Sequence, residues 1–107
     1  MFTRIVELTT KPGKNEQLSA TINDRVLPIL KKQRGFVDEM ILVSDKEDNR
    51  VLALSFWNTS QDAEQYHRTE YSKVQETVRP LLDAEPVIRT YEVHTSTTHK
   101  IAAGKAA

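Results

Sequence analysis

The order of strand-like and helix-like segments constrains the fold of this chain most strongly. Four segments have the β-branched and apolar character of strands: residues 2–10, 36–44, 50–57 and 87–95. Two stretches carry apolar residues at three- and four-residue steps, which predicts helices over 14–33 and 63–81. The resulting order, β-α-β-β-α-β, is that of the ferredoxin-like split βαβ fold. This is an α+β class in which an antiparallel sheet carries both helices on one face.

Prolines and capping residues predict where the two helices deviate from regular geometry. Pro28 lies inside the first helix, removes a backbone donor and clashes with the preceding turn, so we expect a kink near residues 24–26. The polar residues 58–60 offer caps for the start of the second helix, which we expect to break near Thr69. Pro80 is expected to distort the last turn of that helix.

The two central strands are predicted to be apolar on both faces. Residues 40–43 and 51–54 are apolar at successive positions rather than at alternate ones. Because both helices would cover one face of the sheet, a lone chain would expose a large apolar patch on the other face. Such a patch usually marks an interface, and a two-fold related copy of the same sheet is the simplest cover. We therefore expect a homodimer formed through the open sheet face.

Composition narrows the domain organisation and the classes of partner. We expect one domain over residues 1–95 and a flexible tail over 96–107, which is small, polar and rich in Ala and Gly. Fifteen basic residues balance fifteen acidic ones, so no overall positive field favours nucleic acid or an anionic membrane surface. There is no cysteine, which excludes disulfides and thiolate metal sites. No secretory signal is visible at the N-terminus, so a cytoplasmic protein is expected.

Four short motifs occur together along the chain: Lys11-Pro12-Gly13-Lys14, Val26-Leu27-Pro28-Ile29-Leu30, Gly35-Phe36-Val37 and Ser55-Phe56-Trp57-Asn58-Thr59-Ser60. With these motifs the chain resembles the antibiotic biosynthesis monooxygenase (ABM) family over about residues 2–94. The resemblance implies a dimeric α+β barrel with a pocket in each protomer. Members of that family include cofactor-free monooxygenases acting on phenolic or quinol substrates, haem-degrading enzymes, and many proteins with no established activity.

Departures from the family patterns argue against two of its branches. The positions matching the haem-degrading branch read Tyr66, Glu76 and about Ile5, in place of a tryptophan, a histidine and an asparagine. Haem is therefore disfavoured, and no cofactor and no metal are expected. The quinol-oxidising branch commonly has histidines at the positions of Tyr66 and Tyr71, so that assignment is weakened as well. The resemblance thus implies a pocket more firmly than a particular reaction.

Six residues form the candidate site: His67, Tyr66 and Tyr71 as catalytic residues, and Trp57, Arg4 and Tyr91 as substrate-binding residues. A phenolic substrate must lose a proton before it can reduce dioxygen, and a histidine accepts protons near neutral pH, which makes His67 the candidate base. Arg4 and the tyrosines could stabilise the resulting phenolate in a dry pocket. Purely structural roles compete with these assignments. Trp57 suits a core aromatic, and His67 lies at a position that can face solvent.

Three functions follow from these observations. The leading hypothesis is a cofactor-independent monooxygenase that acts on a small aromatic or quinol-type substrate held between the sheet and the helices. The second is a ligand-binding or stress-related dimer without catalysis, which the departures at Tyr66, Tyr71 and Glu76 favour. The third is an isomerase or decarboxylase on the same scaffold, because a base and an anion site also suit proton transfer alone.

Overall fold

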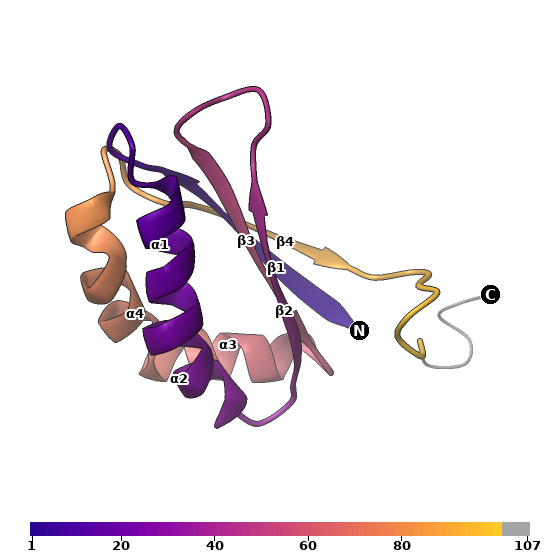
Figure 1. The fold of residues 1–107 in the computed structure, drawn as a ribbon. Helices are drawn as coiled ribbons and strands as arrows, with labels where there is room; N and C mark the ends of the chain where they lie inside the picture. The colour runs from indigo at the N-terminus through magenta and orange to yellow at the C-terminus, as the bar shows by residue number, and fades with distance from the viewer. Residues whose placement is uncertain (102–107) are drawn as a thin grey trace.

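Four antiparallel strands form one sheet in the order β2-β3-β1-β4 (Figure 1). The strands are β1 (Phe2–Thr9), β2 (Phe36–Val43), β3 (Arg50–Trp57) and β4 (Val87–Glu92). The computed structural model describes residues 1–101. The strand order and the antiparallel pairing are those of the predicted split βαβ fold, so the predicted α+β class is confirmed.

All helical segments lie on the same face of this sheet, as the ribbon view shows (Figure 1). They are α1 (Asn15–Thr21), η1 (Ile22–Val26), α2 (Leu27–Lys31), α3 (Ser60–Thr69), α4 (Tyr71–Val78) and η2 (Arg79–Leu81). Their apolar sides pack on the inner face of the sheet and form the core with it. The buried members of that core include Leu8, Leu18, Val51 and Trp57.

A π-helical turn interrupts the first helix immediately before its proline. The turn, η1, covers Ile22–Val26, and Pro28 stands in the first turn of α2. A proline at this place has no N–H to donate, and its ring crowds the carbonyl of Asp24 four residues earlier. Widening the preceding turn to π geometry relieves that clash. The predicted distortion near residues 24–26 is therefore confirmed.

The second helix is capped and broken where the sequence indicates. Thr59 is the N-cap of α3, and its Oγ1 accepts a hydrogen bond of 3.1 Å from the backbone N–H of Asp62. The helical path breaks at Glu70, whose φ of −125° lies outside the helical region, and resumes at Tyr71. Pro80 lies in the 3₁₀ turn η2, which replaces the last α-helical turn. Both predicted irregularities are confirmed.

Strand β4 is shorter than the predicted 87–95 because its partner strand ends first. In the β1–β4 register Phe2 lies opposite Glu92, and Val93 N donates to Met1 O over 2.8 Å. The sheet ladder therefore stops at that point.

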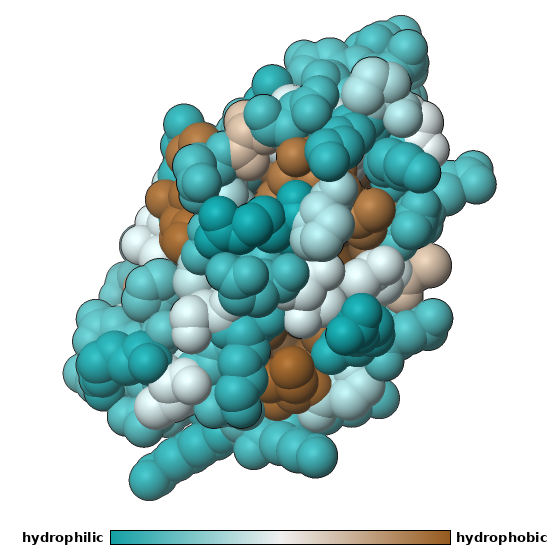
Figure 2. Space-filling view, turned by 90° about the vertical axis from the view of Figure 1, so that its left-hand side faces the viewer, coloured by the Kyte–Doolittle hydropathy of each residue, from teal (hydrophilic) through white to brown (hydrophobic). Residues whose placement is uncertain are grey.

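The outer face of the sheet is uncovered in a single chain and carries large apolar side chains. Met40, Leu42, Val87 and Tyr91 are each between 42% and 50% exposed. The opposite, helix-covered side is mainly hydrophilic, with apolar atoms visible only between polar side chains (Figure 2). The apolar outer face predicted from strands 40–43 and 51–54 is therefore present.

Residues after β4 return toward this outer face. The His99 ring lies 5.9 Å from the Phe56 ring, and His99 Nε2 lies 3.0 Å from Asp38 Oδ2. The predicted limit between domain and tail at residue 95 stays a prediction. The part of the predicted flexible tail over 102–107 lies outside the described residues. Within residues 1–101, no helix combines the length and the apolar character needed to cross a bilayer.

Candidate active site

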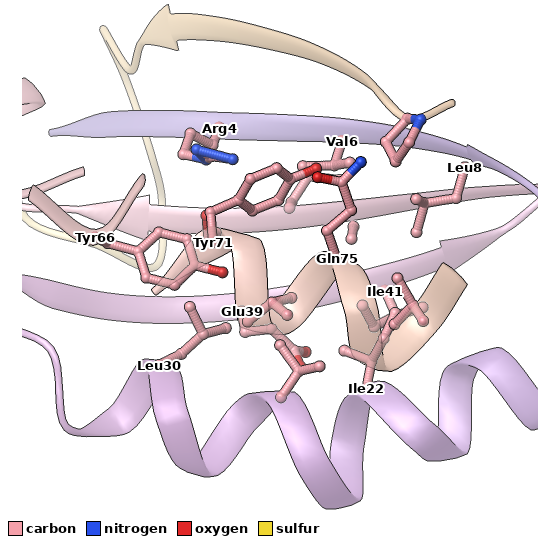
Figure 3. Close-up of a pocket in the computed structure, with 17 residues that line it drawn as sticks. Arg4, Val6, Leu8, Ile22, Leu30, Glu39, Ile41, Tyr66, Tyr71 and Gln75 are labelled. Atoms are coloured by element: carbon pink, nitrogen blue, oxygen red, sulfur yellow. The ribbon is translucent and has the colours of Figure 1, made fainter. Parts of the chain in front are cut away.

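A cavity of about 60 Å³ lies between the inner face of the sheet and the helices (Figure 3). Most of its wall is aliphatic, with Val6 and Leu8 from β1, Ile22 from η1 and Leu30 from α2. Six polar side chains interrupt this wall: Arg4, Glu39, Ser55, Tyr66, Tyr71 and Gln75. An apolar pocket with a few convergent polar groups is the usual form of a small-molecule site.

Arg4 is the central charged group of this cavity. It is 4% exposed, although arginine is rarely so deeply buried without a partner. Its Nη1 donates to His67 Nδ1 over 3.1 Å, whereas its buried Nη2 has no hydrogen-bond partner among residues 1–101. Its Cζ lies 4.8 Å from the Tyr71 ring centroid and 5.4 Å from that of Tyr66. Arg4 is thus held by two tyrosine rings and an imidazole, and its Nη2 amino group is left without a partner among residues 1–101.

The electrostatics of this arrangement favour an anionic guest. Burial lowers the pKa of Arg4, and the two neighbouring tyrosines oppose that shift, but a guanidinium keeps its charge in proteins. No carboxylate within the described residues forms an ion pair with it. Ring faces compensate a buried cation only partly. An oxyanion placed at Nη2 would supply both the missing acceptor and the missing charge.

The two tyrosines flank Arg4 as uncharged phenols. Tyr66 comes from α3 and Tyr71 from α4, and both rings approach the guanidinium (Figure 3). Burial raises the pKa of Tyr66 to about 12, although Arg4 acts in the opposite direction. Burial also raises the pKa of Tyr71, again against the effect of Arg4. Both hydroxyls therefore remain protonated near neutral pH and can donate hydrogen bonds to a bound ligand.

The structure places His67, the candidate base, on the other side of Arg4 from the cavity. His67 is exposed and lines a second, more open hollow together with Phe2 and Ile88. Because Arg4 can only donate, His67 Nδ1 must be the unprotonated, accepting nitrogen, and the imidazole proton sits on Nε2. Burial and then the Arg4 charge lower the pKa of His67. His67 therefore has no free basic nitrogen directed into the cavity in this arrangement.

Trp57 and Tyr91 do not line the cavity. Trp57 is fully buried, stacks on Tyr66 with ring centroids 5.2 Å apart, and donates from Nε1 to Ser55 Oγ over 2.9 Å. It therefore supports the cavity wall from behind. Tyr91 lies opposite Thr3 in the β1–β4 register, one residue out of phase with Arg4, so its side chain belongs to the outer face. Of the predicted site residues, the cavity brings together Arg4, Tyr66 and Tyr71.

Three polar cavity residues were not among those predicted from the sequence: Glu39, Ser55 and Gln75. Glu39 of β2 lies opposite Ser55 of β3, which in turn lies opposite Arg4 of β1, so all three side chains share one row on the inner face. Burial, and then the neighbouring Asp38, raise the pKa of Glu39. The available signal in the sequence was the two adjacent acidic residues, Asp38 and Glu39, in the middle of an apolar strand. Gln75 stands one turn after Tyr71 on α4.

Within residues 1–101, no group of three or more His, Asp and Glu side chains is arranged to hold a metal ion.

Comparison with protein families decides the relationship of this chain. The family model for antibiotic biosynthesis monooxygenases matches residues 1–74. The chain belongs to this family. A search of curated proteins finds no match to the sequence. The family resemblance inferred from the four sequence motifs is thereby confirmed.

Solved structures of several other proteins share the fold at low sequence identity. SnoaB from Streptomyces nogalater, described as a cofactor-independent oxygenase, is 15% identical, with a TM-score of 0.74 over 92% of this chain and 97% of its own. A monooxygenase from the ActVA-Orf6 gene of Streptomyces coelicolor, solved with nanaomycin D, is 15% identical, with a TM-score of 0.77 over 89% and 88%. A protein of unknown function from Nitrosomonas europaea is 17% identical, with a TM-score of 0.74 over 96% and 95%. At these identities the likeness establishes the fold alone.

Proposed function

We propose that this ABM-family protein is a cofactor-independent monooxygenase that oxidises a small aromatic, quinol-type substrate in the Arg4 cavity. One observation carries the proposal, namely the buried Arg4 guanidinium whose Nη2 lacks a partner and borders a mostly aliphatic cavity. Oxygenation without a cofactor needs an electron-rich carbanion or phenolate, and a preorganised cation in a dry site stabilises that anion. The fold shared with SnoaB, a cofactor-independent oxygenase, adds support.

The reaction balances without an added reductant. An aromatic substrate that is oxidised from CH₂ to C=O in its keto form gives up four electrons. One oxygen atom of O₂ becomes the carbonyl oxygen, and the other leaves as water with the two substrate hydrogens. Arg4 would hold the negative charge that forms when the substrate loses its first proton, and the Tyr66 and Tyr71 hydroxyls would add hydrogen bonds to it.

The size of the cavity limits the substrate. Ligand sites commonly measure at least about 300 Å³, whereas this cavity measures about 60 Å³. A single aromatic ring is therefore the substrate that needs the smallest rearrangement. Helix α4 carries the Tyr71 ring and the Gln75 amide, which line the polar end of the cavity. This helix is short and can shift without breaking the sheet.

The proposal includes a homodimer joined through the outer sheet faces. Met40, Leu42 and Val87 would leave water on association, which removes the exposed apolar patch. The main charges on that face are already balanced within one chain, because Glu7 contacts both Arg50 and Arg89, and Arg50 also contacts Glu47. They can therefore enter an interface without leaving an unpaired charge. A cytoplasmic location stays an expectation from the sequence.

A non-catalytic, ligand-binding dimer is the second candidate. The observation that favours it is the hydrogen bond between Arg4 and His67 Nδ1, which occupies the nitrogen expected to act as the base. Oxygen consumption distinguishes the two candidates, and it also separates oxygenation from isomerisation or decarboxylation, which need no O₂.

The test is oxygen uptake by the purified protein with a panel of hydroquinones and naphthols, with anaerobic incubations run in parallel. We expect uptake above the buffer rate with at least one single-ring hydroquinone, and its loss in Arg4→Gln. The matched control is Arg25→Gln, because Arg25 lies in the helical layer that covers the sheet but does not line the cavity. Background uptake with every compound would remove the oxygenase and leave a binding protein or an enzyme that needs no O₂.

A further inference from the structure

Within residues 1–101, Glu39 is the one carboxylate that lines the Arg4 cavity, and it stands at the opposite side of that cavity from the guanidinium. We infer that Glu39 is the catalytic base of this site, taking the proton of the substrate hydroxyl while Arg4 Nη2 receives the resulting oxyanion. This inference rests on the proposed function. It assigns the acid–base role to a residue of β2, in place of His67 of α3.

The strand register sets the distance between the two groups. Glu39, Ser55 and Arg4 occupy successive positions of one row across β2, β3 and β1. Neighbouring strands lie about 4.8 Å apart, so the Cα atoms of Glu39 and Arg4 lie about 10 Å apart. Ser55, the residue between them, has the smallest side chain of the three, so the middle of the row is a trough. A hydroxyl oxygen above this trough lies within reach of both long side chains.

Glu39 and Arg4 are left unpaired with each other. No ion pair between them exists in the described part of the chain, and Arg4 Nη2 has no partner there. Two opposite charges that face one cavity attract each other. A ligand that enters the space between them can therefore interact favourably with both groups. A neutral phenol fits this arrangement, because its O–H faces the carboxylate and its oxygen accepts from the guanidinium.

The proton transfer is balanced within the site. The O–H bond of the phenol breaks, and the proton forms a bond to a carboxylate oxygen of Glu39. The electron pair stays on the phenol oxygen, which becomes a phenolate beside Arg4. Burial raises the pKa of Glu39, which brings the carboxylate closer to the value at which a base works best near neutral pH. The net charge of the site is unchanged, so no proton has to cross the apolar wall.

His67 is the alternative base, and its geometry is less suitable. Its Nδ1 accepts from Arg4, and its Nε2 carries the proton. Removing a substrate proton would require His67 to release Arg4 at the moment when Arg4 must hold the new anion. Glu39 has no such conflict. Within residues 1–101 its hydrogen bond to a side chain comes from its backbone N–H, which donates to Asp38 Oδ1, so the Glu39 carboxylate stays free.

Proton counting on binding tests the inference without turnover. The probe is 4-nitrophenol, offered at a pH where it is neutral in solution, with its absorbance reporting ionisation and calorimetry in buffers of different ionisation enthalpy reporting proton release. We expect the parent protein to bind the probe as phenolate without releasing a proton to the solution. Glu39→Gln is expected to release close to one proton per bound phenolate. The matched control, Glu16→Gln on the exposed start of α1, should behave as the parent.

Oxygen uptake provides the second measurement. If the parent turns over a hydroquinone, Glu39→Gln should lower kcat by about 10²-fold or more, and Glu39→Asp should recover part of the rate. Equal proton release by parent and Glu39→Gln, or binding of the probe as neutral phenol, would overturn the inference even if the enzyme is active. The expected proton counts without any oxygen uptake would instead overturn the proposed oxygenase and leave Glu39 as the proton acceptor of a binding site.

Discussion

Arg4 of β1 and His67 of α3 meet through a single N···N contact of 3.1 Å between Nη1 and Nδ1. Only one of these groups can donate, because the guanidinium has no acceptor, so the contact fixes the His67 tautomer with its proton on Nε2. It also holds Arg4 by one nitrogen and leaves the other available to the cavity. In this geometry His67 orients the cation. We propose Glu39, in place of His67, as the base.

The Arg4–His67 contact predicts a pH dependence of stability. The pKa of His67 is lowered in the folded protein, first by burial and then by Arg4, from an ordinary value of 6.5. The unfolded chain therefore binds more protons than the folded one once the pH falls below about 6.5. We expect the free energy of unfolding to decline from pH 7.5 to pH 5.5 and to vary less in His67→Gln. Urea titrations measure it, with the exposed His94→Gln as control, and a steeper decline in His67→Gln would contradict the assignment.

Arg4→Met tests whether Arg4 is retained for the ligand. A buried charge without a carboxylate partner costs desolvation free energy, and an unbranched apolar side chain of similar length avoids that cost. We expect Arg4→Met to unfold with a free energy equal to that of the parent or about 1 kcal/mol higher, and to lose ionisation of bound 4-nitrophenol. Chemical denaturation and probe absorbance measure the two effects. A clear loss of stability in Arg4→Met would instead show that Arg4 is retained for a structural role.

Tyr66 predicts a loss of stability at alkaline pH. Its pKa is about 12 when folded, against 10 for an ordinary tyrosine. Between these two values the unfolded chain has lost a proton that the folded protein keeps, so the free energy of unfolding falls as the pH rises above 10. Tyr66→Phe should remove that part of the decline. Denaturant titrations at pH 9 and pH 11 measure it, and an unchanged slope in Tyr66→Phe would show that Tyr66 ionises normally.

Trp57 is expected to affect stability and to leave ligand binding nearly unchanged. It is fully buried behind Tyr66 and has no atom on the cavity wall. Trp57→Ala should cost about 3–5 kcal/mol of unfolding free energy, and Trp57→Phe a smaller amount. Because Trp57→Phe keeps an aromatic ring next to Tyr66, its affinity for 4-nitrophenol should stay within about twofold of the parent. If Trp57→Phe keeps its stability but binds 4-nitrophenol about ten times more weakly, Trp57 takes part in ligand binding.

Leu42→Lys tests the outer sheet face as the dimer interface. Leu42 lies in β2 on that face and is 42% exposed in one chain. A lysine there would place a charge in the apolar interface, so the variant should sediment as a monomer at micromolar concentration while the parent sediments as a dimer. Gln17→Lys on the exposed side of α1 is the control. If the parent protein is itself monomeric, the outer sheet face is not a dimer interface.

The sequence predicts the elements better than it predicts the site. Pro28 marks the π turn and Thr59 the cap, because both effects are local. The meeting of Tyr66 and Tyr71 at one site is harder to predict, because residues five apart lie about 140° apart on a continuous α-helix. Only the break at Glu70 brings both rings to Arg4. The phase of that break cannot be read from periodicity, and for the same reason the outward position of His67 could not be settled.

Glu39 escaped prediction because of a strand irregularity. The β2–β3 register shifts between Phe36 and Asp38, so that Phe36 and Glu39, three residues apart, both face the helices. Simple alternation from Phe36 would send Glu39 to the outer face and Asp38 inward. Backbone pairing decides which of two adjacent carboxylates enters the cavity, and that pairing is a long-range property.

The π turn at Ile22–Val26 has a further consequence for how this pocket can diverge. Ile22 and Val26, the two ends of the turn, both belong to the cavity wall. Because a π turn holds one residue more than an α turn, deleting one residue here would restore regular helix, narrow this part of the wall and leave the segment that follows nearly in phase with the preceding one. A single codon lost at this site would therefore reshape one wall of the cavity while every strand of the scaffold kept its place.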